Sequence, residues 1–84
     1  MTAATARFYT ELALMAKPEV ANIVSLFIEK ITERTTEGYA ILIIMRSVIA
    51  PPENGFVDLE QVFSVLRYRG FTVSHTPEFI TISW

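Results

Sequence analysis

The chain has 84 residues, 51% of them apolar, and its seven basic and nine acidic residues give a net charge of −2. A chain of this length predicts one domain, and its charge balance lacks the basic surplus with which nucleic-acid-binding domains contact phosphates. It contains no cysteine, which excludes disulfide bonds and thiolate metal sites.

The sequence carries no signal of membrane insertion or secretion. Its longest apolar run covers residues 39–45, far shorter than the ~20 residues of a membrane-spanning helix. The first 17 residues lack the long apolar segment of a secretory signal peptide. We therefore expect a protein that does not enter a membrane and is not exported by a signal peptide.

Residues 1–17 predict a helical arm that precedes a compact domain at residues 18–84. Phe8, Leu12 and Met15 recur at the spacing of one helix face, and alanines fill much of the remainder. The apolar stripe is narrow, so the arm either docks on a neighbouring chain or packs on its own domain. The pattern leaves both alternatives open.

A second helix is predicted from residue 18 to about residue 37. Pro18 suits the first turn of a helix, and Gly38 offers the left-handed backbone that ends many helices. One broad face of this segment is apolar, as expected for a helix that covers a core. The members of that face are Val20, Ile23, Val24, Phe27, Ile28 and Ile31.

Residues 39–49 are apolar at both parities and rich in β-branched side chains, which predicts a strand covered on both sides. The helix that starts at residue 18 would cover one face. The second cover would be either the N-terminal helix or another subunit. One parity consists of Ile41, Ile43 and Met45, and the other of Leu42, Ile44 and Val48.

A third helix is predicted at residues 59–69, after a loop at residues 50–55 that holds two prolines and an Asn-Gly pair. Gly70 would end this helix and let the next residue fold back on its last turn. An N-cap, a capping box and a hydrophobic staple are predicted at its start, from Asp58, Gln61, Val57 and Val62. The residues expected to be buried are Leu59, Val62, Phe63 and Leu66, with Phe71 against the last turn.

The last segment predicts a β-hairpin whose turn covers residues 75–78 and contains Pro77. One face of the hairpin is rich in hydroxyl groups and the other is apolar, and Trp84 on the apolar face is expected to plug the end of the core. We favour antiparallel pairing of the first strand with the last. The alternative is parallel pairing with the middle strand in a right-handed β-α-β unit.

Together these elements predict a small single α+β domain in the order α-α-β-α-β-β. Its three-stranded sheet is expected to be mostly antiparallel and packed by helices.

The sequence shows no constellation of residues for catalysis or metal binding. His75 is the single histidine, and we expect it to be solvated in the hairpin turn, since His75 and Glu78 alone are too few ligands for a metal. Glutamates between residues 29 and 37 lie beside Lys30 and Arg34, which predicts local ion pairs on a solvated face. We therefore expect no enzyme, no cofactor, no metal and no small-molecule substrate.

The letters "RYRG" at residues 67–70 form the one cluster of basic and aromatic residues. A helix followed by a hairpin is also the order found in a winged helix, with residues 59–69 as recognition helix and residues 71–84 as wing. That helix carries acids in its first turn, where recognition helices meet the groove. Moreover, only one predicted helix separates the first strand from the hairpin, where a winged helix has two.

The chain from residue 23 to residue 84 resembles a recurring pattern among small bacteriophage-encoded proteins of unknown role. The pattern joins an isoleucine-rich helix, a glycine, an apolar strand, "VFSVLRYRGFTV" and "ITISW". Its anchors are Gly38, Leu66, Gly70, Phe71, Val73, Ile80, Ile82 and Trp84. All of them are structural positions, so the resemblance implies a fold and a phage setting, in the host cytoplasm or the virion, and no active-site residues.

These observations favour a non-enzymatic viral protein that acts by protein–protein association. We expect a structural or accessory virion or assembly protein that forms homo-oligomers. The first alternative is a small inhibitor of a host protein, such as an anti-CRISPR factor, and the second is the winged-helix-like nucleic-acid binder. Large aromatic residues dominate interface hot spots. The candidate interface residues are Phe8, Tyr9, Leu12, Met15, Tyr39, Tyr68 and Phe79.

Overall fold

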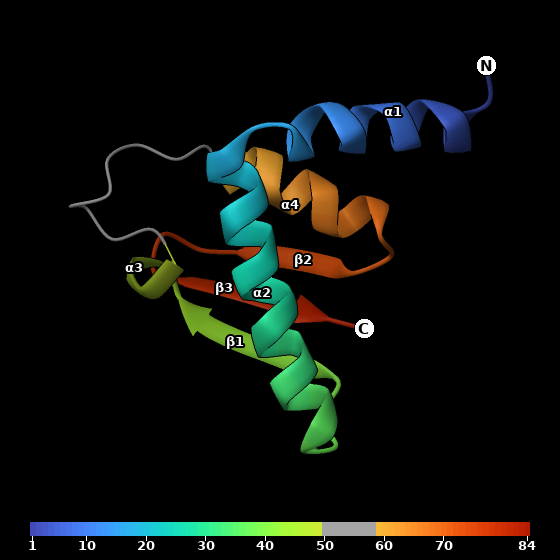
Figure 1. Cartoon of the computed structure of the whole chain (residues 1–84). Helices are drawn as coiled ribbons and strands as arrows, with labels where there is room; N and C mark the ends of the chain where they lie inside the picture. The colour runs from blue at the N-terminus through green and yellow to red at the C-terminus, as the bar shows by residue number, and fades with distance from the viewer. Residues whose placement is uncertain (50–58) are drawn as a thin grey trace.

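Four helices and a three-stranded antiparallel sheet make up the described part of the chain, residues 1–49 and 59–84, in a computed structural model (Figure 1). Helices α2 and α4 cover one face of the sheet, and α1 lies along α4. This arrangement confirms the predicted small α+β domain. The elements in chain order are α1 (Ala3–Met15), α2 (Pro18–Thr36), β1 (Ile41–Met45), α3 (Arg46–Ile49), α4 (Leu59–Tyr68), β2 (Thr72–His75) and β3 (Phe79–Ser83).

The sheet has the strand order β1-β3-β2, so the last strand lies in the middle. Strand β1 pairs antiparallel with β3, with Ile43 opposite Thr81, and β2 pairs antiparallel with β3, with Val73 opposite Ile82. The favoured antiparallel pairing of the first strand with the last is therefore confirmed, and the parallel alternative is wrong.

Helix α2 follows the prediction closely. Pro18 occupies its first turn, and Gly38 takes a φ of 91° directly after its C-terminal turn. The amides of Gly38 and Tyr39 donate to the carbonyls of Thr35 and Arg34, which closes the helix end. All members of the predicted apolar face are buried except Ile28, which is partly buried.

Strand β1 is shorter than predicted, because it ends at Met45 and the next four residues form α3. Its partner β3 begins at Phe79, opposite Met45, and beyond that pair the amide of Arg46 donates to Glu78 in the hairpin turn. With no partner strand left, the chain bends into a helical turn. Val48, predicted to share a strand face with Leu42 and Ile44, is exposed instead, and Ile49 is buried.

Helix α4 buries the predicted residues and ends at Tyr68, one residue earlier than predicted, and Gly70 just beyond it takes a φ of 98°. The amide of Phe71 donates to the carbonyl of Leu66, so the chain folds back on the last turn as expected. The predicted loop at residues 50–55 and the predicted caps at Val57 and Asp58 lie outside the described residues.

Trp84 does not plug the core, because 39% of its surface is exposed. Strand β3 ends at Ser83, so Trp84 lies one residue past the ladder, where its ring meets the edge of Phe71 at 6.2 Å between centroids. The buried positions of β3 are Ile80 and Ile82, which confirms the rest of the predicted apolar face on this strand.

Helix α1 packs on its own chain, through Leu14 and Met15 against the core and through an ion pair between Glu11 and Arg69 of α4. The division into an arm at residues 1–17 and a domain at residues 18–84 stays a prediction. No helix in the described part of the chain is long and apolar enough to cross a membrane.

Candidate protein-binding site

The sheet has one face that no described helix covers, and β1 supplies most of its side chains. Leu42 and Ile44 point toward α2 and are buried. The alternate residues point away from the helices, because successive side chains of a strand face opposite sides of the sheet. Ile41, Ile43 and Met45 are accordingly 41%, 61% and 53% exposed.

The register gathers these side chains into one patch. Met45 lies opposite Phe79 of β3, which is 43% exposed, while Ile43 and Ile41 lie opposite Thr81 and Ser83. We call Ile41, Ile43, Met45 and Phe79 the open-face patch. At about 150–200 Å² for a fully exposed large side chain, these fractions amount to about 300–400 Å² of apolar surface.

The remainder of the open face is polar but uncharged. Its positions on β2 are Thr72 and Ser74, which continue the hydroxyl row of Thr81 and Ser83. None of the open-face positions of the three strands holds an acidic or a basic residue. The face is therefore apolar along β1 and hydroxyl-rich along β2, which is the composition of an interface core beside its rim.

A second apolar surface lies on α1. Phe8, Tyr9 and Leu12 are more than half exposed, and the rings of Phe8 and Tyr9 meet edge to face at 5.7 Å between centroids. We call these three residues the α1 stripe. A groove of about 240 Å³ lies next to it, which is smaller than typical ligand pockets of about 300–1,000 Å³. It is lined by Ala4, Arg7, Phe8, Glu11 and Tyr68.

The candidate interface residues predicted from sequence thus do not form one site. Phe79 belongs to the open-face patch, Tyr68 lines the groove beside the α1 stripe, and Met15 packs partly against the core. Tyr39 lies under the guanidinium of Arg34, 4.1 Å from its ring centroid, at the connection from α2 to β1. The predicted set does not include Ile41, Ile43 and Met45, although their shared parity in an apolar strand places them on one face.

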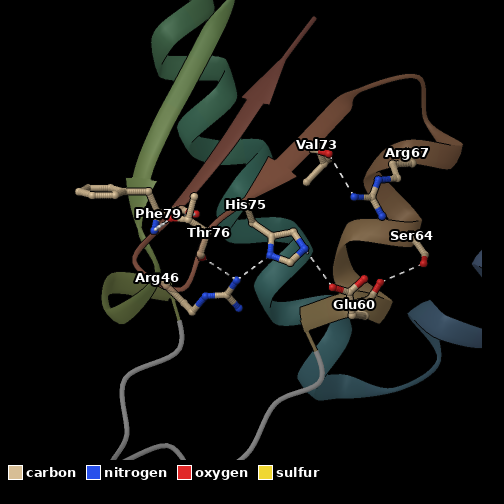
Figure 2. A network of polar contacts seen from close by, with 8 residues as sticks. All are labelled: Arg46, Glu60, Ser64, Arg67, Val73, His75, Thr76 and Phe79. Carbon is tan, nitrogen blue, oxygen red and sulfur yellow. Dashed lines mark hydrogen bonds and ion pairs between the residues drawn. The ribbon is translucent and has the colours of Figure 1, made fainter.

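His75 is the last residue of β2 rather than part of the turn, and it is exposed as expected, but its ring nitrogens face Arg46 and Glu60 (Figure 2). Its Nε2 lies 3.0 Å from Glu60 Oε1 on α4, and Arg46 Nη2 lies 2.9 Å from its Nδ1. Its ring also lies over that of Phe63, with 4.7 Å between centroids. The sequence did not reveal these partners, since Glu60 and Arg46 are far from His75 along the chain.

His75 links β2 to α3 and α4 through its two ring nitrogens. A guanidinium can only donate, so Nδ1 accepts from Arg46 and Nε2–H donates to Glu60. Arg46 Nη2 also donates to the carbonyl of Thr76 at 3.1 Å. Both ring nitrogens of His75 therefore have protein partners in this structure. The described residues contain no group of three potential metal-ligating side chains.

The "RYRG" cluster is occupied by internal contacts. Arg67 Nη2 donates to the carbonyl of Val73 at 3.1 Å, and Arg69 is paired with Glu11 of α1. Helix α1 also lies along α4, the helix that would have to enter a DNA groove (Figure 1). The objection that only one helix separates the first strand from the hairpin is wrong, because α3 lies between them, but the two arginines are engaged by protein groups.

Comparison of the chain with protein-family models, with curated proteins and with solved structures finds no match. The resemblance to small bacteriophage proteins stays a prediction.

Proposed function

We propose that the protein acts by binding other proteins through the open-face patch, as a non-catalytic assembly or accessory protein. The observation that carries this proposal is a set of four large apolar side chains on an uncharged sheet face, each more than 40% exposed. A patch of this size is about as large as the largest apolar patch of a typical monomer, and such patches often mark interaction sites. The sequence resemblance supplies the setting, a bacteriophage particle or the infected host.

Burial of the patch would offset much of the cost of association. Removal of about 300–400 Å² of apolar surface from water contributes about 8–10 kcal/mol at 25 cal/mol per Å². Association costs about 4–15 kcal/mol in lost translation and rotation. A partner that also contacts the neighbouring hydroxyl groups of Thr81 and Ser83 would therefore bind with moderate affinity, as an assembly contact requires.

A comparison of two variants tests this proposal. The open-face variant carries Ile41→Thr, Ile43→Thr and Met45→Thr, which remove apolar surface and keep strand-favouring β-branched side chains. The control variant carries Phe8→Ser and Leu12→Ser in the α1 stripe. The wild type and both variants are immobilised on a resin and incubated with an extract of cells that make the protein naturally. The proteins that each resin retains are identified by mass spectrometry. We expect a partner retained by the wild type and by the control but lost by the open-face variant, and identical retention by all three would refute the proposal.

The α1 stripe favours a second candidate function, inhibition of a host protein. It lies on α1 and is separate from the open face, so it stays available when the open face is occupied. A partner lost only by the Phe8→Ser and Leu12→Ser variant, and identified as a host enzyme whose activity falls on binding, would support this role.

A further inference from the structure

We infer that the partner of the open-face patch is a second copy of this chain, stacked face to face about a twofold axis that passes near Ile43. The inference rests on the proposed function, since it names the partner of the same surface. Two apolar halves meet in this arrangement, and the hydroxyl groups of Thr72, Ser74 and Ser83 lie at the rim of the contact.

The charge distribution favours a second copy. The chain carries a net charge of −2, so two copies gain no long-range attraction from opposite net charges. The open face is uncharged at every strand position, and two copies can approach there without a like-charge contact. A twofold axis also makes the contact self-complementary, because the same residues face each other from both sides.

The area of the face agrees with a weak dimer. The open-face patch contributes about 300–400 Å² per copy, and the hydroxyl residues beside it bring the total buried by two copies to roughly 1,000 Å². Specific interfaces bury about 1,200–2,000 Å², and weak ones lie below that range. We therefore expect a dimer that dissociates on dilution, with a Kd in the micromolar range.

The edges of the sheet favour stacking over strand addition. The amide of Trp84 donates to Ala40, and the amide of Arg46 donates to Glu78, so the even-numbered residues of β1 direct their backbone groups toward β3. The carbonyl of Ile41 accordingly faces the outer edge, where Arg34 Nε donates to it at 3.4 Å. On the other edge, Arg67 occupies the carbonyl of Val73.

Edge pairing would also leave the patch in water, because strand addition extends a sheet without covering its face. Stacking buries the patch between two sheets about 10 Å apart. In a stacked dimer the open-face side chains of β1 would be buried against the partner sheet, as Leu42 and Ile44 are buried against α2.

The experiment measures the mass of the purified protein by sedimentation equilibrium from micromolar to millimolar concentration. We expect a reversible transition from the 9.5 kDa monomer to a dimer of twice that mass. Ile43→Thr and Phe79→Ser should each weaken the dimer about 10- to 100-fold, since each substitution acts twice in a symmetric contact. The control Thr32→Ser, on the exposed side of α2, should leave the transition unchanged.

The lack of native cysteines allows a positional test on the same protein. Ile43→Cys should be joined to its symmetry mate by a short bis-maleimide, whereas Ser25→Cys on the exposed side of α2 should not. A dimer weakened by Ile43→Thr but not by Phe79→Ser would indicate edge pairing and overturn the stacked arrangement.

A monomer at every concentration would overturn the inference alone if the open-face variant still loses a partner from extract. It would overturn the proposed function as well if that variant retains what the wild type retains.

Discussion

The two faces of β1 carry nearly the same side chains in opposite environments. Leu42 and Ile44 are 6% and 9% exposed beneath α2, whereas Ile43, between them, is 61% exposed. Composition therefore does not decide which face is the core; the helices do. An open face that keeps its isoleucines where threonine would serve a strand equally well has a use for apolar surface, and this difference supports a binding role.

The same comparison applies to the central strand β3. Ile80 and Ile82 are fully buried toward the helices, while Phe79, Thr81 and Ser83 point to the open side. Only Phe79, next to Met45, is apolar. The patch is thus confined to the β1 half of the open face. A substitution on this face can therefore be compared with the same substitution at a buried position on the other face.

Two phenylalanines give the largest expected difference. Phe63 is fully buried beneath the sheet, and Phe63→Ala should lower the free energy of unfolding by about 3–5 kcal/mol through lost burial and a cavity. Phe79→Ala should cost less than about 1 kcal/mol in the dilute monomer, because nearly half of its side chain already meets water. Urea titrations followed by circular dichroism measure both. Equal losses would show that the open face is covered in the monomer, against the proposed site.

The same substitution, isoleucine to threonine, can be made at neighbouring positions on the two faces of β1. Ile44→Thr buries a hydroxyl group in an apolar core, and we expect it to cost about 2–3 kcal/mol. Ile43→Thr should change stability by less than about 0.5 kcal/mol at concentrations where the protein is monomeric. Thermal unfolding at low protein concentration measures the pair. If Ile43→Thr lowers the free energy of unfolding as much as Ile44→Thr does, then the Ile43 side chain is not exposed in solution.

Much of this arrangement could be predicted from sequence because it depends on local signals. Pro18, Gly38 and Gly70 fix where helices begin and end, and the alternation in β1 identifies its two faces. The sequence left the sheet order open between two pairings, and the structure shows the favoured one, with β1 antiparallel to β3. The missed features depend on contacts between distant residues: β1 gives way to α3 where its partner β3 begins, and Glu60 and Arg46 contact His75.

The open site was missed for a related reason. Sequence predicted that the second face of β1 needs a cover and offered the N-terminal helix as one candidate. In the structure that helix lies along α4, an outcome determined by Leu14, Met15 and the Glu11–Arg69 ion pair. No local pattern distinguishes a helix that covers a sheet from one that covers another helix, so the sequence left open whether the N-terminal helix or another subunit covers this face.

Substitutions at His75 test how much its ring contact and its hydrogen bonds stabilise the end of β2 against α3 and α4. His75→Ala removes the ring contact with Phe63 and the acceptor for Arg46, and we expect a loss of about 1–2 kcal/mol. His75→Phe keeps the ring contact and loses only the hydrogen bonds, so it should cost about half as much. Urea titrations of the two variants measure the difference. If His75→Phe is as destabilising as His75→Ala, the ring contact contributes little and the hydrogen bonds dominate.

The smallest expected effect concerns α1, which packs on α4 and not on the open face of the sheet. Glu11 and Arg69 are 23% and 37% exposed, and partly exposed ion pairs contribute up to about 1 kcal/mol. Glu11→Gln should therefore cost about 0.5 kcal/mol and increase hydrogen exchange along α1, while the core of α2 keeps its protection. Glu33→Gln is the matched control, because Glu33 is exposed and makes no ion pair among the described residues. Faster exchange along β1 as well would show that docking of α1 on α4 supports the whole sheet. Exchange confined to α1 would show instead that the helix and the open-face patch are independent, so that two partners can occupy them at once.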